Sequence, residues 1–204
     1  NNSMTMEVNI QQFLKRWTTC KEKTSSSTSG RHFGHYRVIH ELCSNVQEGL
    51  RVMATLPFLV GYTPRRWCKA VDKLLLKKES DHRVHRTRPI PLLEADYNDG
   101  AKRLAQGAAA VARNYDLIAG EQYGSVQYKT ASYLCLNKRL IYDISRQRKT
   151  PLAVCSNDAR SCYDRIVHVA DFLALRRLGV PTQALLTLLE TVQRMSHSIR
   201  TVFG

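Results

Sequence analysis

The sequence predicts an α+β protein, because helical and extended segments follow one another without the regular alternation that builds a parallel sheet. Apolar residues recur at spacings of three and four between Val38 and Met53, which is typical of an amphipathic helix. The short apolar stretch 70–76, which leads into a basic turn, is typical of a strand. Of the 204 residues, 43% are hydrophobic and 24% are charged, so the chain can bury enough apolar surface to fold.

Loop and helix-start signals mark the first half of the chain. The Ser/Thr-rich stretch 24–30 predicts a loop. Thr63 and Pro64 predict a helix start, with a capping hydroxyl followed by proline at the first helical position. The segment 88–93, Arg-Pro-Ile-Pro-Leu-Leu, is expected to be extended, because a residue before proline avoids the α region. Residues 97–100, Tyr-Asn-Asp-Gly, are typical of a turn.

Helices dominate the second half. Composition and apolar spacing predict four of them, over residues 101–112, 130–145, 166–178 and 182–194. Gly179 is placed to cap the third in the left-handed conformation. The apolar segment 151–155 predicts a buried strand that ends at polar residues, and 198–203 alternates like the start of another strand.

The charge balance favours a polyanionic partner. Lys and Arg number 31 against 17 Asp and Glu, which gives a formal net charge of +14. Residues 63–90 contain nine basic residues and three acidic ones, so nearly half of the excess lies in one seventh of the chain. Nucleic acid is the partner that this concentration favours. A solvated basic face and an acidic membrane surface are the alternatives, and no amphipathic helix supports the membrane.

Membrane insertion and secretion are not expected. The longest uncharged apolar stretch, 53–62, contains Pro57 and is far shorter than the roughly 20 residues of a spanning helix. The first residues do not resemble a secretory leader. The six cysteines are scattered without a CxxC pair, which favours a reducing compartment.

The residues around Asp158 are suited to metal chemistry. Segment 151–155 would present this carboxylate at its C-terminal end, and Tyr163 follows five residues later where a helix begins. Magnesium prefers oxygen ligands and combines one or two carboxylates with water and substrate phosphates. Two-metal phosphoryl transfer needs further carboxylates from elsewhere in a chain. Plain helix capping is the alternative interpretation, and Asp164 suits it.

The order of these motifs resembles reverse transcriptases of the non-LTR retrotransposon type. Such domains carry an R-P-I-x-L-L element, a helix with an R-L pair, an L-I…Q-x-G element and a D-x4-F/Y-D junction. The matching stretches here are residues 88–93, 103–104, 117–124 and 158–164. The resemblance covers residues 63–204, and segment 28–36 is similar to one that precedes the fingers in retroelement reading frames.

The resemblance implies a right-hand polymerase fold with the fingers subdomain and the first half of the palm. Residues 1–62 would form an N-terminal helical extension with the Ser/Thr-rich loop, 63–150 the fingers and 151–204 the start of the palm. Because the chain begins at Asn1 and stops after the start of a strand, we expect a fragment, truncated before the later palm motifs.

A nucleotidyl-transfer site is also implied. Asp158 matches the first catalytic aspartate, a ligand of two Mg²⁺ (or Mn²⁺) ions, and Tyr163 matches the aromatic residue that excludes a 2′-hydroxyl. The other residues implied to contact the nucleotide are Arg88, Lys77, Lys78, Ala159 and Arg160. The resemblance does not choose between the two lysines.

The resemblance also implies a template path, whereas the later motifs of the family are missing from the sequence. Gln122 and Gly124 match the Q-x-G element, although Ser125 stands where the family has phenylalanine. The later Q-G turn and Y-x-D-D hairpin do not occur, and residues 97–100 match the latter only superficially. We therefore expect that residues 1–204 alone do not polymerise.

Other chemistry is less favoured by the residues. A zinc site could be drawn from residues whose spacings are wider than those of zinc motifs: His32, His35, His82, His85, Cys20 and Cys43. No Cys–His–Asp arrangement surrounds Cys162 to make it a nucleophile, and a small buried residue is the favoured interpretation. Trp17 and Trp67 are expected to anchor the core, and Arg176 and Arg177 to suit the dipole at a helix C-terminus.

The leading hypothesis is part of an RNA-directed DNA polymerase. A primer 3′-hydroxyl would attack the α-phosphate of a deoxynucleoside triphosphate on an RNA template. The alternative is a domesticated or decayed reverse-transcriptase-like module that binds nucleic acid without catalysis. A purely structural interaction protein leaves Asp158 and Tyr163 unexplained. The resemblance implies an intracellular protein, nuclear or cytoplasmic, and the oligomeric state is not predicted.

Overall fold

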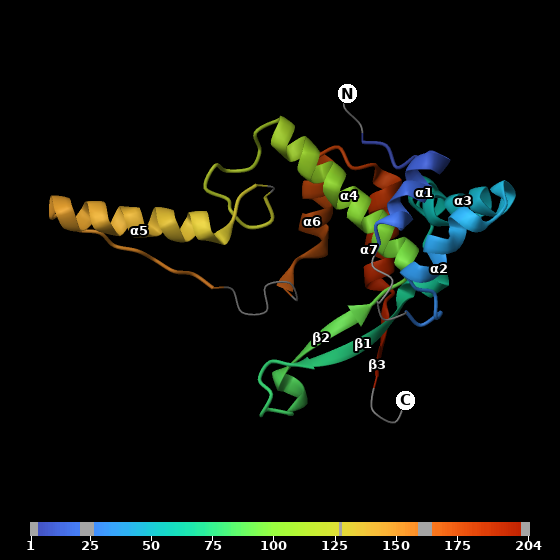
Figure 1. The fold of residues 1–204 in the computed structure, drawn as a ribbon, viewed down its shortest axis with the longest axis horizontal. Helices are drawn as coiled ribbons and strands as arrows, with labels where there is room; N and C mark the ends of the chain where they lie inside the picture. The colour runs from blue at the N-terminus through green and yellow to red at the C-terminus, as the bar shows by residue number, and fades with distance from the viewer. Residues whose placement is uncertain (1–3, 21–26, 127, 159–164, 201–204) are drawn as a thin grey trace. The chain divides into compact units, whose positions relative to one another are not determined.

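A computed structural model describes residues 4–20, 27–126, 128–158 and 165–200 (Figure 1). The chain divides into two compact units. Unit 1 comprises Asn1–Val111 and His168–Gly204, and unit 2 comprises Ala112–Val167. The described residues form α-helices, short 3₁₀ turns and three strands, so the protein is α+β, as the sequence predicts. None of the helices in this part of the chain combines the length and apolar character that a bilayer crossing requires.

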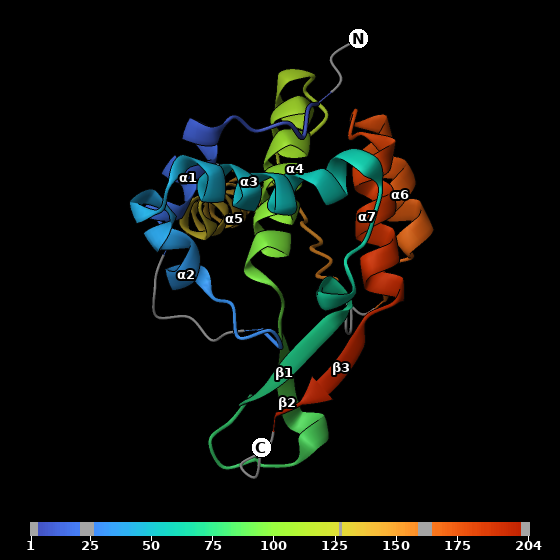
Figure 2. The same cartoon turned by 90° about the vertical axis from the view of Figure 1, so that its right-hand side faces the viewer.

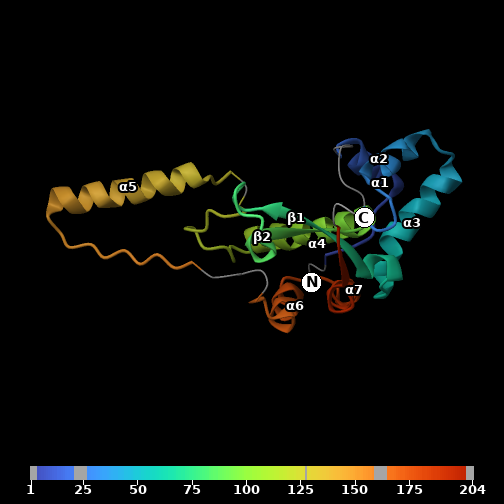
Figure 3. The ribbon, with the colours of Figure 1, turned by 90° about the horizontal axis from the view of Figure 1, so that it is seen from below.

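Unit 1 is built mainly from helices. They are α1 (Ile10–Thr18), α2 (Phe33–Arg37), α3 (Ser44–Val60), most of α4 (Ala95–Asn114), α6 (His168–Arg177) and α7 (Thr182–Gln193), with the 3₁₀ turns η1 (Val38–Glu41), η2 (Arg65–Cys68) and η3 (Val84–Arg86). Helix α4 passes between α1 and α2 on one side and α6 and α7 on the other (Figures 2 and 3). Helix α3 crosses this arrangement and packs against both α1 and α7.

Two apolar clusters stabilise unit 1, and each surrounds a tryptophan that the sequence marks as a core anchor. Trp67 is fully buried, with ring centroids 5.2 Å from Phe58 and 5.4 Å from Tyr97. Trp17 is fully buried in the other cluster and stacks on Tyr36 at 4.4 Å. Aromatic side chains of this size bury large apolar areas, so both predictions of a core anchor are confirmed.

A three-stranded sheet with the order β2-β1-β3 completes unit 1. Strand β1 (Lys69–Leu76) pairs antiparallel with β2 (Thr87–Leu92) and parallel with β3 (Ser196–Ile199). The extended segments predicted over 70–76 and 88–93 are thus confirmed, because they are β1 and β2. Strand β3 begins two residues before the predicted 198–203.

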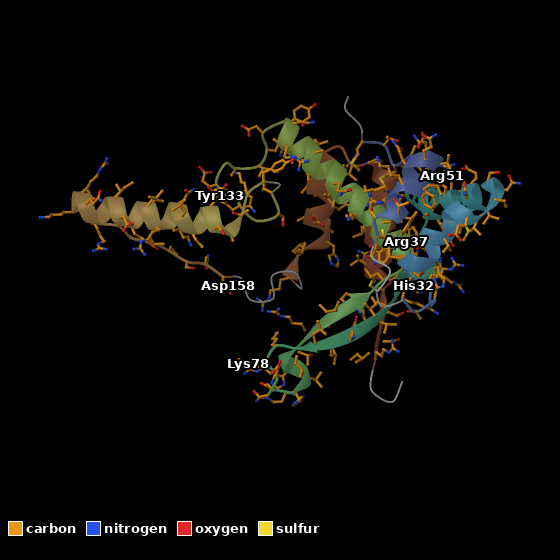
Figure 4. The ribbon with its side chains drawn as sticks, viewed as in Figure 1. His32, Arg37, Arg51, Lys78, Tyr133 and Asp158 are labelled. Atoms are coloured by element: carbon orange, nitrogen blue, oxygen red, sulfur yellow. The ribbon has the colours of Figure 1, made fainter. Side chains whose placement is uncertain are left out.

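Unit 2 holds helix α5 (Ala131–Arg148), which confirms the helix predicted over 130–145. Thr130 caps its first turn by accepting a hydrogen bond from the Tyr133 amide, and Lys149 ends it in the left-handed conformation with φ 50°. Residues 115–126 and 128–130, which precede the helix, form neither helix nor strand. Tyr133 is labelled on this helix in Figure 4.

The predicted buried strand over 151–155 is wrong. Residues 151–158 carry neither helix nor strand, and every one of them is exposed. A strand needs a neighbour to satisfy its backbone groups and to cover its apolar face. The described part of unit 2 contains no other strand that could supply either.

Two local predictions around α4 and η2 also need correction. Residues 97–100 are not a turn but part of α4, where the Asn98 amide bonds the Glu94 carbonyl at 3.0 Å. Thr63 does not cap an α-helix: its hydroxyl donates to the Thr187 carbonyl at 3.2 Å, and only the 3₁₀ turn η2 follows. The Thr63 hydroxyl is therefore used by a residue distant in sequence, whereas at 97–100 helix formation in α4 outweighs the turn preference.

The end of α6 follows the prediction. Gly179 has φ 82°, its amide bonds the Arg176 carbonyl at 3.0 Å, and the Val180 amide bonds the Leu175 carbonyl at 3.2 Å. This pair of bonds is the Schellman arrangement, which needs a left-handed residue and therefore favours glycine. The tight cap turns the chain directly from α6 into α7.

Candidate functional site

The β1–β2 hairpin brings together the basic residues that the sequence assigns to nucleotide contact. Leu75 pairs with Arg88 and Leu76 with Thr87, and Lys77 and Lys78 follow directly where β1 ends. Residues directly opposite in an antiparallel pair project to the same face of the sheet. Arg88 therefore projects from the same face of the sheet as Leu75. Lys77 follows Leu75 by two residues, just after β1 ends. All three basic side chains are exposed, and Figure 4 shows Lys78 at the far end of the hairpin.

The loop that closes the hairpin forms a basic hollow of about 230 Å³. Its lining residues are Lys77, Lys78, Asp81, Arg83 and Arg86. Asp81 accepts two hydrogen bonds of 2.8 Å from the guanidinium of Arg83, and this bond lowers the pKa of the carboxyl group. Lys77, Lys78 and Arg86 have no ion-pair partner among the residues that the structure describes. The hollow thus has an excess of positive charge facing solvent.

A buried ion network holds the base of the hairpin. Arg66, just before β1, bonds both oxygens of Asp96, with one contact of 2.8 Å, and reaches Glu94 at 3.0 Å. The indole of Trp67 also donates to Asp96 at 3.1 Å. The side chains of Glu94 and Asp96 are 0% and 1% exposed, so Arg66 supplies the cation that two buried carboxylates require.

The same network binds two residues of the Ser/Thr-rich stretch 24–30. Ser27 donates to Glu94 Oε1 at 2.7 Å, and Ser29 donates to Glu94 Oε2 at 2.9 Å. These residues belong to the Ser/Thr-rich stretch that the sequence predicts as a loop. Part of that loop is therefore fixed against the junction of β2 and α4.

Burial and charge oppose each other at Arg66 and act together at its neighbour Tyr36. Burial alone would lower the pKa of Arg66, but the hydrogen bond and charge of Asp96 outweigh it, so the pKa is raised above its ordinary value. Burial, followed by the charge of Asp96, raises the pKa of Tyr36. Arg66 is therefore a permanent cation in this network.

Gln122 and Gly124 lie together in a turn of unit 2. The amide side chain of Gln122 donates to the Gly124 carbonyl at 3.0 Å, and its backbone amide bonds the Ala119 carbonyl at 2.9 Å. Nearby, Lys129 lies 5.2 Å from the ring centroid of Tyr123. The Q-x-G element is thus a locally stabilised turn with Gln122 exposed.

Asp158 is an exposed carboxylate at the end of the extended segment 151–158 in unit 2 (Figure 4). One accessible carboxylate, free to combine with water and phosphate oxygens, fits a magnesium ligand. Ala159, Arg160 and Tyr163 lie outside the described residues. Among the residues that the structure describes, no three His, Cys, Asp or Glu side chains lie together in a way that could hold a metal ion.

Sequence reasoning missed the residues that support the hairpin. Glu94 and Asp96 flank Ala95 directly after the proline-rich strand β2, at the start of α4. This pair of carboxylates was the available signal for a nearby cation, although acidic residues there also suit the helix dipole. A second missed contact joins His197 on β3 to the buried Asp72 on β1, with Nδ1 at 3.0 Å from the carboxylate.

Comparison of the chain with models of known protein families gives no match, and comparison with curated proteins gives none either.

Proposed function

We propose that the protein is part of an RNA-directed DNA polymerase and that the β1–β2 hairpin binds the nucleotide and template backbone. The supporting observation is the hairpin itself, which presents Lys77, Lys78 and Arg88 on one exposed element with no acidic partner among the described residues. The order of the sequence motifs resembles that of reverse transcriptases, and for this reason we assign the basic surface to a polymerase. In that interpretation the hairpin is part of the fingers of a right-hand polymerase, and residues 151–204 begin the palm.

The hairpin residues would act by position and charge. Lys77 and Lys78 would neutralise triphosphate oxygens as point charges, and Arg88 would offer two parallel donors to a phosphate. Arg88 stands on a paired strand, so little backbone entropy would be lost there when phosphate binds, and Lys77 and Lys78 follow directly after the last paired residue of β1. The Arg66 network would hold the base of the hairpin during that contact.

Asp158 would hold Mg²⁺ at the reacting phosphate. When bound, the ion supplies Lewis-acid stabilisation of the attacking and leaving oxygens. The carboxylate would fix its position, while the hydroxyl of a primer attacks the α-phosphate and pyrophosphate leaves. The proposal makes the hairpin a binding element and Asp158 a catalytic residue.

Binding of a primer–template duplex tests the hairpin. In fluorescence anisotropy, Lys77→Gln/Lys78→Gln should weaken binding and flatten the slope of log affinity against log salt by roughly 1–2, because fewer phosphates are neutralised. The matched control is Arg176→Gln/Arg177→Gln, which removes two exposed charges at the end of α6. An equal loss in both double variants would contradict a hairpin site.

The alternative is a nucleic-acid-binding module without catalysis, which the same basic hairpin supports. The two functions share the binding result and differ at Asp158. A binding module needs no metal ligand there, so it would show no extension and its affinity for nucleic acid would not change when Asp158 is replaced. The two are separated by primer extension.

A further inference from the structure

A second hollow in unit 1 lies away from the hairpin, between α1, α2 and α4. Its volume is about 480 Å³, within the range of about 300 to 1,000 Å³ that is usual for small-molecule sites. Arg16 and Lys102 line it together with Asp99, Phe33 and Gln106. Neither the motifs of the sequence nor the proposed function uses this hollow.

The charges beside the hollow do not balance. Asp99, whose side chain is 5% exposed, receives Nε of Arg16 on one oxygen and Nε of Arg103 at 3.2 Å on the other. Two guanidinium groups thus share one carboxylate, and the cluster retains one positive charge. Lys102, next to Arg103 on α4, is exposed at the hollow and has no ion-pair partner among the described side chains.

Arg16 lines the hollow and Arg103 does not, and burial disfavours the charge of both arginines. Nη2 of Arg103 is buried and has no hydrogen-bond partner in the described structure. Burial, followed by the charge of Arg103, lowers the pKa of Arg16, and burial lowers the pKa of Arg103 to about 10. A partly buried cluster that disfavours its own cations gains from a negative charge placed next to it.

The rest of the lining suits a ligand larger than a bare anion. Phe33 offers a partly exposed ring, of the kind on which nucleobases stack. Gln106 is exposed on α4 and can both donate to and accept from a base edge. We propose that this hollow binds a nucleoside monophosphate, with the phosphate at Arg16 and Lys102 and the base against Phe33 and Gln106.

Calorimetric titration with AMP, inorganic phosphate and adenosine tests the site. The titrations use the Lys77→Gln/Lys78→Gln protein, so that the hairpin does not contribute and a failure of the proposed function leaves the result readable. AMP should bind more tightly than phosphate or adenosine alone. Phosphate that binds as tightly as AMP would overturn the nucleoside part, and absence of AMP binding would overturn the whole proposal.

Exposed residues provide variants that keep the fold. Lys102→Gln should weaken AMP binding by about fivefold or more through the loss of a charged contact, and Gln106→Ala should weaken AMP but not phosphate. Lys15→Gln on α1, which removes an exposed charge outside the hollow, is the control and should leave the affinity unchanged. Equal losses for Lys102→Gln and Lys15→Gln would show general attraction to a basic protein and contradict the site.

The same chemistry is present in a free nucleotide and in one unit of a nucleic-acid strand. Competition with a short oligoadenylate that lacks terminal phosphates separates these sources. If the oligoadenylate displaces AMP and Lys102→Gln makes this displacement weaker, the hollow binds a nucleotide of a strand. If Lys102→Gln does not change the displacement, the strand binds elsewhere, which contradicts strand binding at the hollow.

Discussion

Arg88 lies directly opposite Leu75 in the antiparallel pair of β1 and β2, so strand register sets the face of the sheet from which its side chain projects. The register places it on the same hairpin as Lys77, which follows two residues after Leu75. A displacement by one residue would transfer Arg88 to the other face of the sheet. The basic character of this hairpin therefore depends on the pairing of two strands.

Replacement of Arg88 should affect nucleotide contact selectively. In the presence of a primer–template, Arg88→Gln should weaken dATP binding by about tenfold, because a bidentate charged contact is lost. Arg113→Gln, an exposed arginine at the end of α4, should have no such effect. The measurement is equilibrium filtration with labelled dATP, and equal affinities in the two variants would exclude Arg88 as a phosphate ligand.

The ion network at the base of the hairpin should be necessary for stability. Arg66→Gln leaves Glu94 and Asp96 buried without their cation, and we expect a loss of roughly 3 kcal/mol in the free energy of unfolding. Its exposed neighbour provides the control, because Arg65→Gln should change the free energy of unfolding by less than about 0.5 kcal/mol. Urea denaturation followed by circular dichroism measures both. A small effect of Arg66→Gln would mean that the carboxylates are stabilised by other groups.

Two glycines should respond to alanine with opposite signs. A Cβ at Gly100 would lie 2.0 Å from Cε2 of the fully buried Phe58, so Gly100→Ala should destabilise the protein by about 1–3 kcal/mol. Gly49 lies inside α3 with nothing within 4 Å of the new methyl group. Gly49→Ala should therefore stabilise the protein by about 0.5–1 kcal/mol. Thermal unfolding compares the two, and an unchanged or raised melting temperature of Gly100→Ala would contradict the close contact at Phe58.

Alkaline pH should destabilise the fold through Tyr97. Burial raises the pKa of this hydroxyl to about 12, whereas its ordinary value is 10.0. Between these pH values the unfolded chain loses the proton that the folded chain keeps. The contribution of Tyr97 to the free energy of unfolding is therefore fully present below pH 10 and is lost as the pH rises toward 12. From pH 8 to about pH 11, Tyr97→Phe should lose about 1 kcal/mol less than the natural protein. Urea midpoints at the two pH values measure the difference, and parallel losses would contradict this assignment.

Local sequence signals were sufficient for most elements of unit 1. The apolar stretch that became β1 and the proline-rich segment that became β2 each carry their conformational preference in consecutive residues. The cap at Gly179 is equally local, because a left-handed residue is needed within one turn of the helix end. Such features depend on neighbours within a few positions, and the sequence displays those neighbours directly.

The errors arose where distant residues decide the structure. The exposed segment 151–155 has the composition of a buried strand, but composition does not supply a partner strand. Ser27 and Glu94 are 67 positions apart, so no local pattern could pair them. The lysines and Arg88 were assigned through resemblance, while their juxtaposition depends on the register of β1 and β2.

The most direct test of the account is primer extension by the full-length gene product with Asp158→Asn. The control is Asp116→Asn, which changes another exposed carboxylate of unit 2 at a left-handed position that asparagine also tolerates. The account predicts that Asp158→Asn abolishes Mg²⁺-dependent extension on an RNA template while duplex binding persists, and that Asp116→Asn retains extension. Extension that continues undiminished in Asp158→Asn would contradict the polymerase assignment.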